Sequence, residues 1–345
     1  MTRVRLRDPY AWPATAGRAR SGERAELAPL WAKGQLHVHT SRSFDGRMPP
    51  EAVVRAYREL GFHFICITDH DRLWTGCAFD QGLLVVPGEE STLLRPFPPL
   101  GRHLLRLFVR ESVPALARAD RKIALSTQQG ALLAAAHPAW SGNLGTGRWQ
   151  VATLADSRLM LVEIVNHHSP TRDNVALWDA ALAARGADAP LWATGVDDSH
   201  RSEQIGRAWV WVRLERPLDA FPSPWQAALH LRAALASGAF YPSTGARARF
   251  GVVQEGDETQ AVAVEVERSP GTAPENSPPG VAPHGSQQPP AIRFFGARGH
   301  LLHEAFAWQA RYAPRGGEGY VRVEVTLHGG QAAWSQPFWL VERAP

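Results

Sequence analysis

The feature that most constrains the fold of this 345-residue chain is an alternation of apolar and helix-like segments between residues 34 and 250. The apolar segments are short and almost uninterrupted, and they include FHFICITDH, LLVVPGEE, HLLRLFV, ALLAAAHP, RLMLVEIVN and LWATGVDDSH. Helix-like segments such as PPEAVVRAYRELG and NVALWDAALAARG separate several of them. Strands that are apolar on both faces are typical of parallel sheets covered by helices on both sides. The number of these units favours a barrel over an open sheet.

Beyond residue 250 the pattern changes to short strands with no helix between them, such as AVAVEVE, AIRFFG, YVRVEVTLHGG and QPFWLV. This pattern predicts a small all-β domain over residues 251–345. Residues 268–290 are so rich in Pro, Gly and Ser that we expect a disordered insertion there. Residues 1–33 have weak periodicity and are expected to form an N-terminal extension, which leaves residues 34–250 as the main domain.

Bulk properties narrow the class of protein. The formal net charge is +4, and the chain has only two cysteines, which argues against a disulfide framework and a cysteine-rich zinc site. No block of Lys or Arg resembles a nucleic-acid-binding arm, no apolar run approaches the length of a membrane span, and the N-terminus lacks the apolar core of a signal peptide. We therefore expect a cytoplasmic protein that acts on a small molecule. The sequence does not indicate its oligomeric state.

Potential metal ligands follow the predicted strands at their carboxyl ends, which in a barrel meet at one mouth. His37 and His39 are two residues apart in GQLHVHT, so on a strand they point to the same side. Glu90 and its neighbour Glu89 are alternatives at the third strand end. Together the strand ends supply His37, His39, Asp45, His70, Glu90, His103, His137, Asp198 and His200. One tetrahedral ion needs only four ligands, so this number predicts a site for two or three ions. Mixed imidazole and carboxylate ligands suit Mn, Fe or Zn.

The ordered motifs HVHT, SFDG, TDHD, GEEST, AHP and GVDDSH, over roughly residues 34–245, resemble those of the polymerase and histidinol phosphatase (PHP) superfamily. The resemblance implies a distorted (β/α)7 barrel whose rim holds up to three Mn, Fe or Zn ions. It gives ligand roles to the nine residues above and favours Glu90 over Glu89. Asp45 departs from the pattern, because HTSRSFDG has one residue more than the expected spacing. The segments SGAFYPSTG, YVRVEV and AWSQPFWLV also resemble a subgroup of PHP hydrolases similar to carbaryl hydrolase.

This set of motifs predicts metal-dependent hydrolysis of a small phosphoester by a hydroxide that bridges two ions, since coordination lowers the pKa of water towards about 7. Glu90 and Asp198 are candidates for the shared carboxylate. His70 and His200 are candidates for proton transfer, but both are also metal candidates, so the general acid is unassigned. The same hydroxide could attack a carboxylic ester or a carbamate, which is the alternative reaction. A PHP-like binding module without turnover is the third and least favoured alternative.

Other residues near the predicted mouth are candidates for substrate binding. Arg72 directly follows the motif TDHD, and Arg201 directly follows DDSH. The geometry of the N–H groups of a guanidinium matches that of phosphate oxygens, so either arginine is a candidate for binding phosphate. His167 and His168 follow another strand end, and we take His167 as a candidate for binding substrate. Trp74 and Trp140 lie on predicted rim loops, where an aromatic wall would sit.

The last motif carries a geometric prediction. Asp198 and His200 should enter the mouth opposite His37 and His39, because residues two apart on an extended segment share a face. The carboxylate of Asp198 should then lie within about 4–5 Å of an imidazole nitrogen of that pair. Asp197 is one residue out of phase, so its side chain should point away from the mouth and interact with the backbone or with a histidine behind the site.

Overall fold

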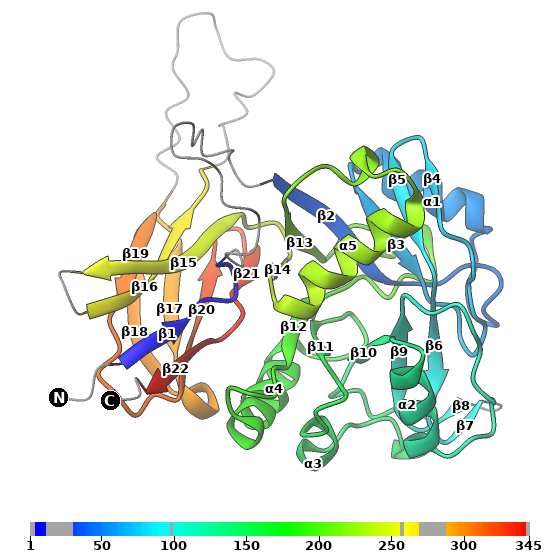
Figure 1. Cartoon of the computed structure of the whole chain (residues 1–345), viewed down its shortest axis with the longest axis horizontal. Helices are drawn as coiled ribbons and strands as arrows, with labels where there is room; N and C mark the ends of the chain where they lie inside the picture. Colours follow the sequence, from blue (N-terminus) through cyan, green and yellow to red (C-terminus); the bar gives the residue numbers. More distant parts are fainter. Residues whose placement is uncertain (1–3, 12–29, 97–98, 256–258, 269–287, 343–345) are drawn as a thin grey trace, which may run out of the picture.

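The computed structural model describes residues 4–11, 30–96, 99–255, 259–268 and 288–342. Figure 1 shows an α/β part on the right and a part made almost entirely of strands on the left. Most of the expected N-terminal extension and of the expected insertion at 268–290 lies outside the described residues. The described pieces of the extension contribute β1 (Val4–Arg7) and the start of β2 (Leu30–Val38).

The α/β part has two groups of strands. One group belongs to a large mixed sheet and contains β2, β3 (Phe64–Ile67), β4 (Ala78–Asp80), β5 (Leu83–Val86), β13 (Trp209–Leu214) and β14 (Phe240–Ser243). The other is a five-stranded sheet of β6 (Gly88–Thr92), β9 (His103–Leu107), β10 (Leu132–Ala135), β11 (Leu161–Val165) and β12 (Trp192–Gly195). A ribbon of β7 (Arg95–Pro96) and β8 (Pro99–Leu100) lies between β6 and β9 along the chain.

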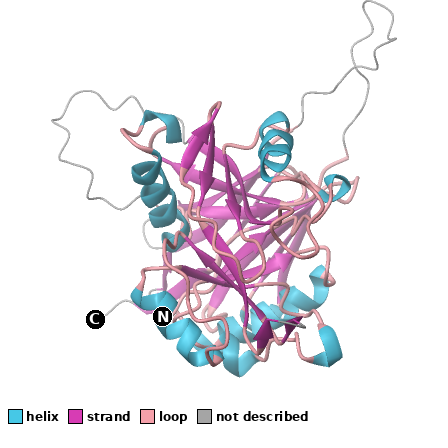
Figure 2. Cartoon of the chain, turned by 90° about the vertical axis from the view of Figure 1, so that its right-hand side faces the viewer, coloured by secondary structure: helices cyan, strands magenta, loops and turns pink. Residues whose placement is uncertain are grey.

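The helices are α1 (Pro50–Glu59), α2 (Ala119–Gln128), α3 (Val151–Leu154), α4 (Thr171–Arg185) and α5 (Pro224–Ser237). Figure 2 shows most of them at the periphery, around the central strands. Local sequence explains their ends. In α5 the side chain of Ser223 accepts a hydrogen bond from the backbone N–H of Gln226, and Gly238 ends the helix with a φ of 81°, a conformation that glycine adopts without strain. Among the described residues, no helix is both long and apolar enough to cross a membrane.

The described strands do not form a continuous barrel. β9 runs antiparallel to both β6 and β10, whereas β2–β3, β3–β5, β10–β11 and β11–β12 are parallel pairs. The two sheets meet through isolated bridges, His70 with Glu90 and Val38 with Ser199, and not through a ladder. The reversal of β9 follows from its connection, because the chain passes from β6 to β9 through the β7–β8 ribbon instead of a helix. The structure therefore shows a mixed α/β fold, and the closed (β/α)7 barrel stays a prediction.

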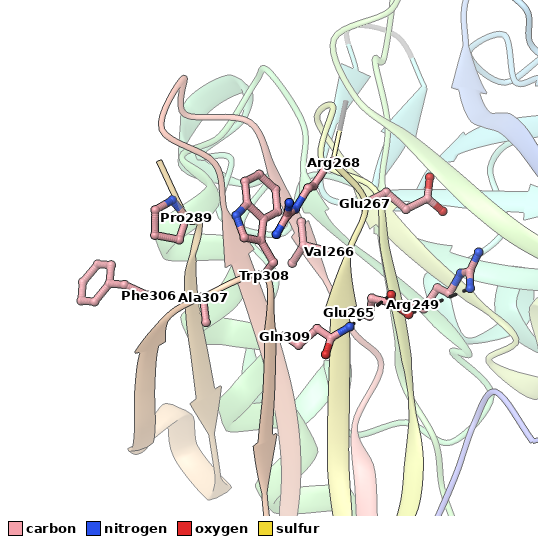
Figure 3. Close-up of a pocket in the computed structure, with 10 residues that line it drawn as sticks. All are labelled: Arg249, Glu265, Val266, Glu267, Arg268, Pro289, Phe306, Ala307, Trp308 and Gln309. Atoms are coloured by element: carbon pink, nitrogen blue, oxygen red, sulfur yellow. Dashed lines mark hydrogen bonds and ion pairs between the residues drawn. The ribbon is translucent and has the colours of Figure 1, made fainter. Parts of the chain in front are cut away.

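The strand-rich part is joined to the α/β part by hydrogen bonding. It contains β1, β15 (Ala248–Glu255), β16 (Thr259–Val266), β17 (Ala291–Phe295), β18 (Leu301–Phe306), β19 (Gln309–Tyr312), β20 (Tyr320–Thr326), β21 (Ala332–Trp334) and β22 (Phe338–Glu342). β14 pairs with β21, so the large sheet runs through both parts, and the β1–β22 pair forms its edge in the strand-rich part. A surface pocket beside Trp308 opens between the segments that carry β16, β18 and β19 (Figure 3).

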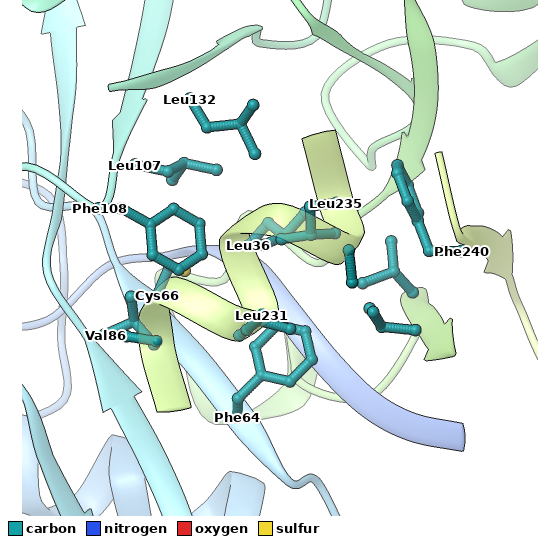
Figure 4. Packing of buried hydrophobic residues seen from close by; sticks show 14 of the residues in the cluster. Leu36, Phe64, Cys66, Val86, Leu107, Phe108, Leu132, Leu231, Leu235 and Phe240 are labelled. Atoms are coloured by element: carbon teal, nitrogen blue, oxygen red, sulfur yellow. The ribbon is translucent and has the colours of Figure 1, made fainter. Parts of the chain in front are cut away.

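Side chains from both sheets of the α/β part meet in one buried cluster. Leu36 and Phe64 enter it from the large sheet, and Leu107 and Leu132 enter it from the five-stranded sheet. Figure 4 shows the leucines of α5 packed among these side chains. Burying a leucine or phenylalanine side chain contributes about 1.5–3 kcal/mol to the free energy of unfolding. This shared core fixes the two sheets relative to each other, and with them the loops at their strand ends.

Candidate metal centre

A cavity of about 220 Å³ opens at the end of the α/β part that holds the carboxyl ends of β2, β3, β10 and β12 and the amino end of the antiparallel strand β9. Seven of the nine predicted ligands line it: Asp45, His70, Glu90, His103, His137, Asp198 and His200. The other two, His37 and His39, are fully buried and contact the lining carboxylates from below. The structure thus brings all nine residues together, although they are spread over more than 160 positions of the sequence.

The deepest group of candidate ligand atoms belongs to four buried residues. The Nε2 atoms of His37 and His39 lie 3.0 Å apart. Oε2 of Glu90 lies 3.1 Å from each of them, and Oδ1 of Asp198 lies 3.2 Å from the first and 3.1 Å from the second. Ligands that bind one ion at about 2.0–2.2 Å are separated from each other by about 3–3.6 Å. These four atoms therefore have the spacing of one coordination sphere.

Glu90 connects this group to a second one. Its Oε2 atom lies 3.0 Å from Nδ1 of His70, and its Oε1 atom lies 2.8 Å from Nδ1 of His103 and 3.2 Å from Nε2 of His137. The two oxygens of one carboxylate thus face different sets of imidazoles. This arrangement suits a carboxylate shared between two ions.

A third group lies towards the opening of the cavity. Oδ2 of Asp45 is 3.2 Å from Nε2 of His200 and 3.4 Å from Nε2 of His70. His39 belongs to this group as well, and its ring stacks on that of His200 at 4.2 Å between centroids. The additional residue in HTSRSFDG therefore does not keep Asp45 away from the cluster.

Unpaired buried atoms provide a test of whether these residues fit metal ions. Many candidate ligand atoms are within ion-pair distance of one another, yet several have no aligned hydrogen-bond partner. They are Oδ1 of Asp45, Nδ1 of His70, Oε2 of Glu90, both ring nitrogens of His103, Nδ1 of His137 and Oδ1 of Asp198. Burying polar atoms without partners is costly. Cations at the centres of these groups would satisfy most of them at once, so the residues fit two or three divalent ions.

The pKa shifts of the buried groups also agree with a site for cations. Burial alone would raise the pKa of Glu90 and of Asp198, but the neighbouring histidines hold both well below their usual range. Burial likewise opposes protonation of His39, yet Asp198 and Glu90 raise the pKa of this imidazole to about 9. The carboxylates are thus ionised, and the cluster favours positive charge at its centre, whether protons or metal ions supply it.

The structure places Asp198 and Asp197 in the two different positions that the strand register predicts. Asp198 approaches both His37 and His39, as described above. Asp197 points away and accepts hydrogen bonds from the backbone N–H groups of Gly206, Arg207 and Ala208. Asp198 has a φ of 51°, a left-handed conformation that costs energy in a residue other than glycine. The loop therefore holds this carboxylate in place against a backbone preference.

Glu163 belongs to the centre and is missed by the motif analysis. It is fully buried in β11, and its Oε1 atom lies 2.7 Å from Nδ1 of His37. Its Oε2 atom accepts hydrogen bonds from the backbone N–H of His137 and the side-chain amide of Asn166. A carboxylate on the far nitrogen of a ligand imidazole fixes the ring and raises its basicity. The available signal was a charged residue inside the otherwise apolar strand LVEIV.

The predicted substrate-binding residues are placed differently from one another. Arg72 and Arg201 are exposed and are not part of the cavity lining. His167 contacts the backbone carbonyl of Asp197 through Nδ1 at 2.7 Å and also does not line the cavity. Its neighbour His168 does line it, with Nε2 3.5 Å from Oδ2 of Asp198. The histidine that reaches the cavity at this strand end is therefore His168.

Comparisons with known proteins agree with the motif analysis. Residues 35–109 match the family model of the PHP domain. Error-prone DNA polymerases of Mycobacterium bovis and of two strains of Mycobacterium tuberculosis are 28% identical over 276 residues, which cover 67% of this chain. The matched region covers only 24% of each polymerase, so the chain spans about a quarter of the length of these curated relatives.

Two solved structures are similar at low identity. One is a two-domain protein from Bacteroides vulgatus ATCC 8482 that contains a predicted PHP-like metal-dependent phosphoesterase; it is 14% identical, with a TM-score of 0.49 and coverage of 91% of this chain and 96% of that one. The other is a proposed metal-dependent phosphoesterase from Bifidobacterium adolescentis ATCC 15703, 17% identical, with a TM-score of 0.38 and coverage of 51% and 90%. The match to the PHP-domain model spans the segment that carries the motifs HVHT, SFDG, TDHD and GEEST, so this part of the chain is similar to a PHP domain.

Proposed function

We propose that this protein is a metal-dependent phosphoesterase that hydrolyses a small phosphoester at a multinuclear site. The observation that carries the proposal is the convergence of nine imidazole and carboxylate side chains on one cavity, where several buried ligand atoms have no other partner. The PHP-domain match over residues 35–109 supports the same chemistry. Mn, Fe and Zn are all compatible with this ligand set.

Each group of side chains has a distinct task in this proposal. His37, His39 and Asp198 would hold one ion, His103 and His137 would hold a second, and Glu90 is within reach of both groups. Two divalent ions in such a site lower the pKa of a water molecule to about 7 and polarise a phosphoryl oxygen. Asp45 and His200, nearer the opening, are placed to hold a third ion or to contact the substrate directly.

A second candidate reaction, hydrolysis of a carboxylic ester or carbamate, is favoured by one observation. The lining of the cavity contains no Lys or Arg side chain among the described residues. No guanidinium or ammonium group would therefore help the ions to bind a phosphate group, and the same ions could stabilise the oxyanion formed from an acyl group. A binding module without turnover is less well supported, because every ligand motif is filled by a residue type that can bind metal.

The test combines elemental analysis with a substrate panel. The purified protein should contain Mn, Fe or Zn and should hydrolyse aryl phosphates; exhaustive chelation should abolish turnover, and the metal should restore it. His39→Ala should lose metal and turnover together, whereas His328→Ala, at an exposed turn, should keep both. Clear preference for aryl acetates or carbamates would select the second reaction. Turnover that survives complete metal removal would refute both.

A further inference from the structure

Two aromatic side chains at the cavity have no role among the proposed ligands. Phe44 is 62% exposed, and its ring stacks on His70 with 5.1 Å between centroids and 25° between planes. Trp140 lies 5.0 Å from the ring of His103 and 4.8 Å from that of His137. Both aromatic rings line the cavity. They therefore border the same cavity at different places, Phe44 beside His70 and Trp140 beside His103 and His137.

A glycine-rich loop holds Trp140 in place. Residues 141–147 close on themselves through a hydrogen bond of 2.8 Å from the backbone N–H of Gly147 to the carbonyl of Ser141. A Cβ atom on Gly147 would lie only 2.7 Å from Cε3 of Trp140, and one on Gly142 would lie 3.2 Å from Cζ3. The loop thus packs directly against the indole ring, which is positioned before any ligand arrives. Such preorganisation reduces the entropy cost of binding.

The charge of the lining restricts what else the substrate can carry. Asp45, Glu90 and Asp198 are acidic, and the lining contains no basic side chain other than histidine among the described residues. A phosphoryl group therefore meets metal ions and histidines there, but no Lys or Arg side chain among the described residues. The remainder of the substrate meets the aromatic rings of Phe44 and Trp140, so a second anionic group on it would find no Lys or Arg side chain among the described lining residues.

We propose that Phe44 and Trp140 form a clamp for a planar apolar group, so that the substrates are small aryl phosphoesters. This proposal rests on the proposed phosphoesterase function and adds the class of leaving group. In the reaction the bond between phosphorus and the aryl oxygen breaks. Water supplies the hydroxyl group to phosphorus and a proton to the aryl oxygen, which leaves as a phenol.

The test measures equilibrium binding to the metal-loaded protein by calorimetry, with phenylphosphonate and methylphosphonate as probes. Both probes carry the same metal-binding group, so their ratio of affinities reports on the clamp. We expect phenylphosphonate to bind more tightly, and Phe44→Ala and Trp140→Ala each to reduce that preference by about 2–10-fold, the range for one aromatic contact. Methylphosphonate affinity should be unchanged.

Matched controls keep the outcome interpretable. Phe306 is 67% exposed on β18, in the strand-rich part, and Phe306→Ala should keep the full preference. Since Phe44 is also largely exposed, Phe44→Ala tests the clamp with little effect on folding. Equal affinity of both probes, or a preference that survives both substitutions, would refute the clamp and leave the phosphoesterase proposal intact. Failure of both probes to bind the metal-loaded protein would instead remove the phosphoesterase proposal, and the clamp with it.

Discussion

At the scale of single residues, the neighbours Asp197 and Asp198 perform different tasks because their side chains point to opposite sides of one segment. Mutating a residue that supports a metal ligand typically lowers metal affinity by about 10–100-fold, and we expect Asp198→Asn to lower it by more than this. Asp197→Asn should instead lower the free energy of unfolding by about 1–3 kcal/mol, since its new amide group faces backbone N–H donors. Metal titration and denaturant unfolding of both variants separate the two effects. Loss of metal from Asp197→Asn alone would contradict this assignment.

Glu163 provides a second prediction at this scale. Glu163→Gln keeps the shape of the side chain but removes the negative charge beside Nδ1 of His37, so metal affinity should fall by about 10–100-fold. Glu89→Gln is the matched control, because Glu89 is also buried but pairs with Arg106 outside the cavity. The control should lower thermal stability and leave metal affinity nearly unchanged. Equal metal affinities of the two variants would show that Glu163 is only structural.

The convergence of the candidate ligands on one cavity was predictable because strand ends and motif spacing place them. The partners behind them were not, since Glu163 acquires its role only when β11 brings it next to His37 near the end of β2. For a related reason the sequence analysis selected His167, whereas it is His168 that lines the cavity. Nothing in the run of two histidines indicates which one the bridge between Asn166 and Ser169 turns towards the cavity.

At the scale of elements, apolar runs located the strands but not their directions or irregularities. β10, β11 and β12 appear where the runs predict them, whereas the antiparallel direction of β9 depends on a ribbon that the pattern does not encode. β2 contains a bulge between Gln35 and Val38. Leu36 packs in the core between the sheets, while Val38 packs against α1, although a regular strand would place both on one face. The regular alternation of side chains between the two faces of a strand therefore holds only approximately in β2.

The side chain of Gln336 forms hydrogen bonds with the backbone at the edge of β12, and this leads to a prediction about this strand. Gln336 accepts a hydrogen bond from the backbone N–H of Ala193 and donates to the carbonyls of Ala193 and Phe240. Gln336→Ala should speed amide hydrogen exchange at Ala193 and lower the free energy of unfolding by about 1–3 kcal/mol, because buried backbone groups lose their partners. Gln309→Ala, which removes an exposed glutamine, is the control. Unchanged protection at Ala193 would contradict this role for Gln336.

At the scale of the whole molecule, the change in pattern near residue 250 marks a change of architecture without separating the two parts. Ser243 of β14 pairs with Ala333 of β21, which joins the two parts in one sheet. These partners lie far apart in the sequence, and a pattern read along the chain does not reveal which distant strands pair. We therefore expect the two parts to unfold together, and a buried ion pair between them provides the test.

The pair joins Asp179 on α4 to Arg322 on β20. Both side chains are buried, and the guanidinium donates two hydrogen bonds, of 2.8 and 2.7 Å, to the carboxylate. Arg322→Leu leaves the Asp179 carboxylate buried, with the hydroxyl of Tyr320 as its one side-chain donor among the described residues, so the free energy of unfolding should fall by about 3–5 kcal/mol. Asp179→Leu combined with Arg322→Leu should lose much less than the sum of the two single changes, because no unpaired charge remains. Denaturant unfolding of the four proteins gives the coupling energy, and strictly additive losses would show that the pair does not connect the two parts.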